Sequence, residues 1–219
     1  GEWQQGVFHG VGKIRWASGD EYEGNFVEGA MHGQGDYVFA NGSEYSGTWS
    51  EGKFHGWGTL IFPDGSKYVG DFNLGERHGR GTLMESNGDT YVGEFQHGKF
   101  DGEGVHSFSD GSSYAGNFRQ GVSHGNGTFT SAEGVVYSGD WKNGEKHGVG
   151  KLLLSDGGTY TGDYRKNVVH GIGTFTFPSG QRYTGEWRNG KEHGFGTEIF
   201  PRGDKYVGEW QNGEKNGVG

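Results

Sequence analysis

The chain has 219 residues, a formal net charge of −9, 49 glycines and no cysteine. Without cysteine it can form neither a disulfide framework nor a thiolate metal site. With only three prolines it cannot be collagen-like, in spite of its glycine. Aromatic residues make up 15% of the chain and provide surface worth burying, which argues against disorder. No apolar run approaches the roughly 20 residues that a membrane span needs.

The charge is distributed unevenly along the chain. Residues 1–110 carry 7 Lys and Arg against 17 Asp and Glu, a balance of −10, while residues 111–219 carry 12 against 11, a balance of +1. An acidic first half disfavours nucleic acid and anionic lipid there. We therefore expect no nucleic-acid partner.

A four-residue motif, His-Gly-x-Gly, returns every 23 residues without insertion or deletion, and of the 49 glycines only Gly158 lies off this lattice. The copies are HGVG at 9–12, HGQG at 32–35, HGWG at 55–58, HGRG at 78–81, DGEG at 101–104, HGNG at 124–127, HGVG at 147–150, HGIG at 170–173, HGFG at 193–196 and NGVG at 216–219. A fixed period of this length is typical of repeat architectures. It predicts a single continuous array over residues 1–219, of about nine repeats, with no linker and no second domain. Both ends are in phase with the repeat, so we expect this array to be a fragment of a longer one.

One repeat predicts the elements of all the others. In residues 59–81, the apolar run TLIF predicts a strand, PDGS a turn and KYVGDF a second strand, after which NLGERHGRG returns the chain to the next hairpin. The fold class predicted is all-β, an elongated, rod-like, single-layer twisted antiparallel sheet built from 23-residue β-hairpins. Two strands per repeat give a length of about 85 Å.

Each repeat contains an aromatic pair around a glycine. Because side chains alternate along a strand, Tyr68, Gly70 and Phe72 share one face, and the glycine leaves bare backbone on which neighbouring rings can lie. One hairpin cannot bury two rings, but stacked hairpins cover each other. Burial of a large apolar side chain contributes roughly 1.5–3 kcal/mol, so we expect these rings to dominate stability.

The segment YTGEWRNGKEHGFG at 183–196 fits the pattern YxGxWxxGxxHGxG residue for residue. This pattern at a 23-residue period resembles the MORN repeat (membrane occupation and recognition nexus), and a chain made only of such repeats resembles the MORN-only cytoskeletal scaffold proteins of protozoa. The resemblance implies a scaffold or adaptor, not an enzyme, and no cofactor. It also implies binding of helical segments of cytoskeletal or motor-type proteins along the sheet groove, and homodimerisation through the last repeats. The alternative it leaves open is a module for phosphoinositides or a membrane surface. The expected location is the cytoplasm, on the cytoskeleton or at the membrane periphery.

Two chemical interpretations of the motif compete with a structural role. The GxG pairs suggest a phosphate cradle, but that site needs a helix after the glycines, and strands follow here, so we interpret them as turns. The histidines recur about 10 Å apart, too far to share a zinc ion within one chain. We expect them to satisfy backbone groups of the loops, with a metal held between two chains as the alternative.

Three surfaces are predicted. The partner groove is formed by Tyr45, Trp49, Tyr68, Phe72, Tyr91, Phe95, Tyr114, Phe118, Tyr137 and Trp141. The dimer interface is formed by Phe175, Phe177, Trp187, Phe200, Tyr206 and Trp210, although packing within the chain is an equal alternative for each of these rings. A patch for anionic lipid is formed by Arg165, Lys166, Arg182, Arg188 and Lys191, diluted by nearby glutamates.

Overall fold

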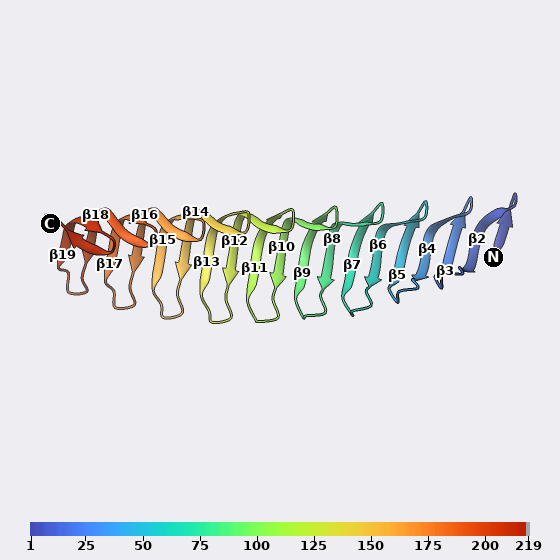
Figure 1. Cartoon of the computed structure of the whole chain (residues 1–219), viewed down its shortest axis with the longest axis horizontal. Coiled ribbons are helices and arrows are strands. Elements are labelled where there is room, and N and C mark those ends of the chain that lie inside the picture. Colours follow the sequence, from blue (N-terminus) through green and yellow to red (C-terminus); the bar gives the residue numbers. More distant parts are fainter. Residues whose placement is uncertain (218–219) are drawn as a thin grey trace. The chain divides into compact units, whose positions relative to one another are not determined.

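The computed structural model describes residues 1–217, and its elements are twenty β-strands in antiparallel pairs (Figure 1). The last two residues of the NGVG copy at 216–219 lie outside the described residues. The strands are β1 Glu2–Gln4, β2 Val7–Arg15, β3 Glu21–Val27, β4 Ala30–Val38, β5 Glu44–Ser50, β6 Lys53–Ile61, β7 Lys67–Asn73, β8 Glu76–Met84, β9 Thr90–Gln96, β10 Lys99–Ser107, β11 Ser113–Arg119, β12 Val122–Thr130, β13 Val136–Lys142, β14 Glu145–Leu153, β15 Thr159–Arg165, β16 Val168–Thr176, β17 Arg182–Arg188, β18 Lys191–Ile199, β19 Lys205–Gln211 and β20 Glu214–Asn216. The predicted all-β class, with antiparallel sheets built from hairpin repeats, is confirmed.

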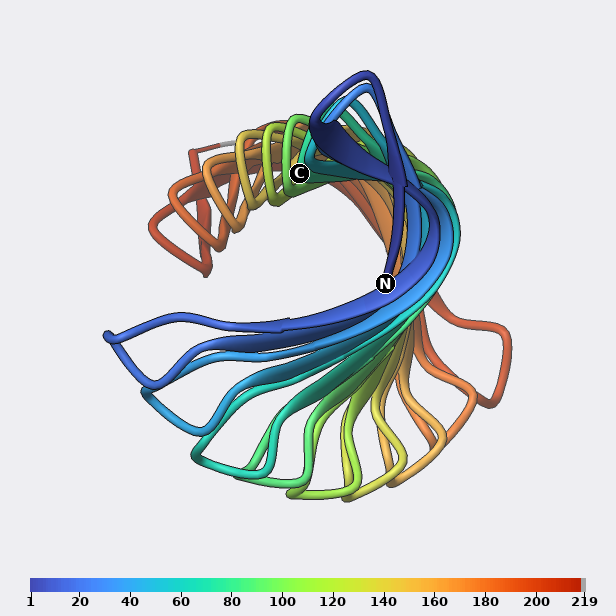
Figure 2. The same cartoon turned by 90° about the vertical axis from the view of Figure 1, so that its right-hand side faces the viewer.

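The chain divides into two compact units, residues 1–109 and residues 110–219. In the N-terminal unit each strand from β1 to β10 pairs with the next strand along the chain. In the C-terminal unit β11 to β20 do the same. Successive hairpins of the N-terminal unit, blue to green in Figure 2, fan out one after another, as expected for strands with a right-handed twist.

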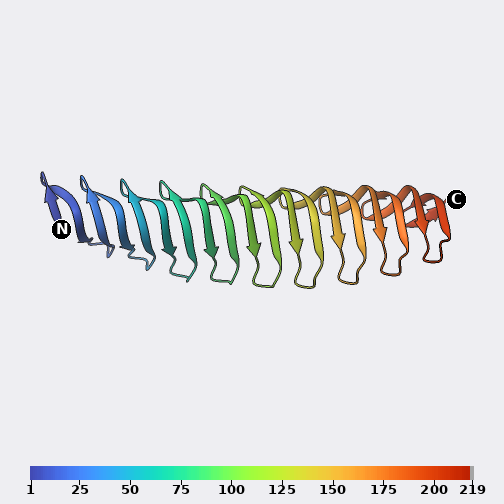
Figure 3. The ribbon, with the colours of Figure 1, turned by 180° about the vertical axis from the view of Figure 1, so that it is seen from behind.

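Two kinds of connection alternate along the chain, one at each end of the strands (Figure 3). The first is a two-residue turn such as Leu74-Gly75, whose φ values of 51° and 93° are those of a type I′ hairpin turn. The second is a wider loop such as the one between β6 and β7. It is closed by a 2.8 Å bond from the Phe62 N–H to the Ser66 carbonyl, with Gly65 at φ 89° as expected for PDGS.

The expectation that the HGxG motif forms a turn is wrong. HGRG at 78–81 lies inside the nine-residue strand β8. Its first glycine, Gly79, has φ 57°, and the pairing of β7 with β8 shifts between Gly70 and Phe72. The glycine therefore introduces a bulge that bends the strand without ending it.

The tyrosines and their aromatic partners form the core along one face of the sheet, here called the aromatic face. Tyr183 contacts Trp187 of its own repeat and Trp210 of the next, with ring centroids 5.2 and 5.0 Å apart and planes near perpendicular. Beneath the Tyr183 ring lies the cross-strand pair Gly185 and Gly196. The predicted role of the glycine, to leave room for rings that join neighbouring repeats, is confirmed.

In the described residues no helix could cross a membrane.

Candidate interaction surfaces

The ten aromatic residues predicted to line a partner groove form the buried layer of the aromatic face. All are between 0% and 8% exposed. The hydroxyl groups of the five tyrosines among them donate to carbonyls of the chain, as in Tyr45, whose hydroxyl donates to the Thr48 carbonyl at 2.8 Å. Burial raises the pKa of Tyr45 to about 12, so the hydroxyl stays protonated. A partner on this face would therefore contact the side chains above these rings.

Those side chains belong to a second layer, which we call the cover row. It contains the residue nine positions after each tyrosine: Met31, Phe54, Arg77, Phe100, Ser123, Lys146, Val169, Glu192 and Lys215. Where the contact is resolved, the cover residue lies over the ring of its own hairpin. Phe54 stacks on Tyr45 at 3.8 Å, the Arg77 guanidinium lies 5.7 Å from the centre of Tyr68, and the Lys146 ammonium lies 4.9 Å from the centre of Tyr137. The buried layer is constant in chemistry, whereas the cover row changes from repeat to repeat.

The C-terminal unit has a hollow of about 300 Å³ in this face. Its lining residues are Leu152, Tyr160, Val169, Phe175, Phe177, Trp187, Gly190 and Glu192. Val169 is shorter than the ring that occupies the same repeat position at Phe54. Phe175 leans toward Gly158, the glycine off the lattice, with its Cζ 3.4 Å from where a Cβ would lie. The small cover residue therefore leaves space between the rings that line the hollow.

A buried carboxylate lies further along the same unit. Glu198 is 8% exposed, and its Oε2 is 2.8 Å from the Lys215 Nζ. The Gln181 side chain donates to its Oε1. Lys215 in turn lies 4.7 Å from the centre of Phe200 and 4.9 Å from that of Tyr206. The signal for this ion pair was a glutamate at an inward position of the strand alternation.

The six residues predicted for a dimer interface fall into a buried group and a half-buried group. Trp187 and Trp210 are buried within the chain, and the Trp187 Nε1–H donates to the Gly173 carbonyl at 3.1 Å. The other four, Phe175, Phe177, Phe200 and Tyr206, are half-buried. Phe175 and Phe177 contact each other with centroids 4.6 Å apart. The half-buried rings are the ones with surface available to a second chain.

The five basic residues predicted for a lipid patch are all exposed, but they are not all at one place. Arg188 pairs with Lys191 across a two-residue turn. In the equivalent turn one repeat earlier, Arg165 is the last residue before the turn and Lys166 is its first residue. Arg182 lies at the other end of β17, about 20 Å from Arg188. The structure thus brings four of these cations to the turns at one end of the strands and separates Arg182 from them.

The HGxG amides are already bonded. The Ile172 N–H, inside the copy at 170–173, donates to the Asp163 carboxylate at 2.8 Å, and the Phe195 N–H donates to Glu186 at 3.1 Å. Each carboxylate fills the space beside the first glycine, so a phosphate would have to displace it. Among the histidines, the His124 Nδ1 accepts the Asn143 N–H at 3.4 Å, one example of the expected contact with turn backbone. Within residues 1–217, no cluster of three or more metal-binding side chains is present.

The opposite face carries a row of exposed apolar side chains. They occupy the variable position of HGxG and are between 58% and 62% exposed: Val11, Trp57, Val149, Ile172 and Phe195. The motif itself contained this signal. Its second glycine lies under a tyrosine on the aromatic face, and side chains alternate along a strand, so the residue at x points to the opposite face.

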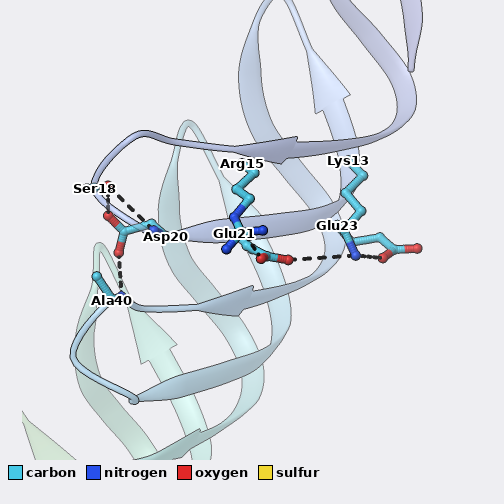
Figure 4. A network of polar contacts seen from close by, with 7 residues as sticks. All are labelled: Lys13, Arg15, Ser18, Asp20, Glu21, Glu23 and Ala40. Atoms are coloured by element: carbon cyan, nitrogen blue, oxygen red, sulfur yellow. Dashed lines mark hydrogen bonds and ion pairs between the residues drawn. The ribbon is translucent and has the colours of Figure 1, made fainter.

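The opposite face of the N-terminal unit also carries a polar network (Figure 4). The Lys13 ammonium is 3.0 Å from Glu23, and the Arg15 Nε is 3.2 Å from Glu21. Asp20 accepts the hydroxyl of Ser18 and, at 2.9 Å, the N–H of Ala40 in the next loop. Exposed pairs of this kind contribute little to stability, but the Asp20 bond joins consecutive loops.

Comparison with solved structures finds chains of low identity. The TCP domain of Drosophila melanogaster SAS-4 (dCPAP), solved in complex with a proline-rich motif of Ana2, is 11% identical with a TM-score of 0.34, over 92% of this chain and 90% of that one. The TCP10 domain of Danio rerio CPAP, in complex with a STIL peptide, is 12% identical with a TM-score of 0.32, over 94% and 91%. Comparison with curated proteins finds no match.

The MORN repeat family model matches ten consecutive segments, at residues 1–21, 22–44, 45–67, 68–90, 91–113, 114–136, 137–159, 160–182, 183–205 and 206–219. Each full segment begins on the tyrosine that lies over the glycine pair. The chain therefore belongs to the MORN repeat family.

Proposed function

We propose that this protein is a scaffold or adaptor that binds segments of partner proteins on its aromatic face. Proteins built from MORN repeats generally act as non-enzymatic scaffolds. The observation that carries the proposal is the contrast between the two layers of that face. The buried layer keeps the same aromatic chemistry in every repeat, whereas the side chain of the cover row changes from each repeat to the next. Helical segments of cytoskeletal or motor-type proteins are the partners that the family resemblance favours.

Two lysines of one strand test which face binds. Lys146 belongs to the cover row, and Lys151, also in β14, is exposed on the opposite face. A photo-reactive amino acid placed at each position in cells should cross-link a common partner from position 146 and not from position 151. Equal cross-linking from both positions, or none from 146, would contradict the proposal.

We also propose that the protein forms homodimers through its C-terminal repeats, with Phe200 and Tyr206 in the contact. Their half-burial supports this, because it leaves part of each ring accessible to a second chain. Light scattering should give twice the monomer mass of 23.8 kDa. Phe200→Asp should give the monomer mass, whereas Phe62→Asp, at the same repeat position in the N-terminal unit, should leave the dimer intact. A monomeric wild-type protein would exclude dimerisation.

Binding to an anionic membrane surface is the second candidate, favoured by the four cations in the turns at one end of the strands of the C-terminal unit. In the described structure none of Arg165, Lys166, Arg188 and Lys191 is in an ion pair. Each contributes about 1 kcal/mol near an anionic membrane. Co-sedimentation with phosphatidylserine vesicles should be lost when Arg165 and Arg188 become glutamine and retained in Arg182→Gln. Equal sedimentation with neutral vesicles would rule out this electrostatic binding.

Finally, we propose that residues 1–219 fold as one array, because the 23-residue period passes residues 109 and 110 unchanged. Limited proteolysis should then show no preferred cleavage there. Early cleavage into two resistant halves would show two separate domains.

A further inference from the structure

The hollow beside Val169 is flanked by two charges of opposite sign that belong to the same cover row. Lys146 precedes Val169 by one repeat, and Glu192 follows it by one repeat and lines the hollow itself. Both side chains are half-buried. The row therefore runs cation, hollow, anion along the C-terminal unit.

Neither charge is neutralised by its own chain. No ion pair within residues 1–217 includes Lys146 or Glu192, in contrast to Lys215 and Glu198, which pair with each other at 2.8 Å. The ammonium of Lys146 lies against the Tyr137 ring, and burial there lowers the pKa of Lys146. An anion from a partner would favour the charged form of this lysine.

The spacing of the three positions sets the partner's geometry. Consecutive cover residues are one repeat apart, which is two strands or roughly 9–10 Å. Seven residues of an α-helix rise about 10.5 Å, so side chains at i, i+7 and i+14 of a helix lying along the face match the three positions closely.

We propose that the row Lys146, Val169 and Glu192 is a recognition site for a helical segment that carries an acidic residue, a bulky apolar residue and a basic residue, in that order along the face. The apolar side chain fills the hollow, the acidic one meets Lys146 and the basic one meets Glu192. The two charges also fix the direction in which the segment lies. This inference rests on the proposed adaptor function and adds the chemistry of the partner.

Alanine-rich helical peptides test the order of charges. Three labelled peptides carry Phe at i+7 and differ in the charged residues at i and i+14. The mixed peptide has Glu at i and Lys at i+14, the second has Glu at both positions and the third has Lys at both. Fluorescence anisotropy gives their Kd values. The mixed peptide should bind the wild type about two- to fivefold more tightly than either of the others. In the variant Glu192→Lys the preference should move to the peptide with two glutamates. Equal affinities, or a preference that Glu192→Lys does not move, would overturn the charge assignment.

A filled hollow tests the apolar anchor. Val169→Phe places a ring where Phe54 stacks on Tyr45, so the fold should persist, as circular dichroism would verify. It should weaken the mixed peptide at least tenfold. Ser123→Phe makes the same substitution at the same repeat position, outside the site, and should not weaken it. Unchanged affinity in Val169→Phe would overturn the proposal, even if face-specific cross-linking from position 146 still supported the general adaptor function.

Discussion

The ring of Tyr183 occupies the space above Gly196, so that a Cβ on this glycine would lie 2.5 Å from Cε2 of the tyrosine. The same glycine faces Gly185 across the strand pair, and a Cβ on Gly185 would lie 2.5 Å from the Cα of Gly196. Neither added Cβ could be accommodated, because the one on Gly196 would meet a buried ring and the one on Gly185 would meet backbone. The two glycines of each repeat are thus required by the tyrosine that covers them.

Gly196→Ala should lower the free energy of unfolding by about 1–3 kcal/mol, the usual cost of overpacking a filled core. Urea denaturation would measure it. Gly158→Ala is the matched control, because its Cβ would lie 3.1–3.4 Å from its neighbours, the nearest of them a side-chain oxygen of Asp156. A loss in Gly158→Ala as large as in Gly196→Ala would contradict this explanation.

The protein should lose stability in alkaline solution. Burial raises the pKa of Tyr22, Tyr45 and Tyr137 from 10.0 to about 12. A raised folded pKa means that the neutral hydroxyl is favoured in the folded state. Its contribution is complete below pH 10 and is lost as the pH rises toward 12. Urea midpoints measured across this range, with tyrosinate absorbance recorded in parallel, should fall together with ionisation. Tyrosines that ionise near pH 10 while the protein stays folded would contradict this prediction.

At the acid end, three loop aspartates of the N-terminal unit should matter. The pKa of Asp20 is lowered by the Ser18 hydroxyl and then by the Ala40 N–H, and that of Asp89 chiefly by the Ser109 N–H. The pKa of Asp64 is lowered chiefly by its bond from the Ser66 N–H. Lowered folded pKa values stabilise the protein above the ordinary value of 3.8, and this contribution is lost as the pH falls through them.

Thermal unfolding between pH 5 and pH 2 would therefore show a falling Tm, to which all three carboxylates contribute. Asp89→Asn keeps an oxygen acceptor for the Ser109 N–H but cannot titrate, so it should reduce the slope of Tm against pH. An unchanged slope would show that this aspartate does not contribute.

Removal of a single hydroxyl should have a measurable cost. Tyr45→Phe deletes the 2.8 Å bond to the Thr48 carbonyl and leaves that acceptor short of a partner, so we expect a loss of about 1 kcal/mol. Tyr206→Phe is the control, because the equivalent 3.1 Å bond to Glu209 is exposed and water can replace it. Equal losses would show that burial does not determine the effect.

Much of the fold followed from the period of the sequence. The tyrosine, the glycine two residues later and the ring four residues later had to share a face, and stacking then required an antiparallel sheet. The HGxG motif was misplaced because glycine predicts turns and bulges equally well. Only the pairing of β7 with β8 shows that Gly79 bends a strand that continues to Met84.

The candidate sites were less accessible to sequence reasoning. Alternation put Tyr137 and Trp141 on the inner face correctly, but it could not show that Lys146 would cover them, because the bulge at Gly148 alters the count along β14. The separation of Arg182 from Arg188 follows from strand length, which the sequence indicated only approximately. The hollow is lined by side chains from several strands, and no sequence pattern marks that arrangement.

The two-layer construction places a constant buried layer beneath a variable cover row. A cover residue such as Phe54 lies on the tyrosine of its own hairpin, while Tyr45 and Phe72 make the contact that joins one repeat to the next. The cover residue also contacts the next repeat, since Phe54 lies 5.5 Å from Phe72 and the Arg77 guanidinium donates to the Gly98 carbonyl. A change in the cover row therefore alters the surface of one repeat and its contact with the next, while the buried tyrosine and glycine pair of every repeat stays the same.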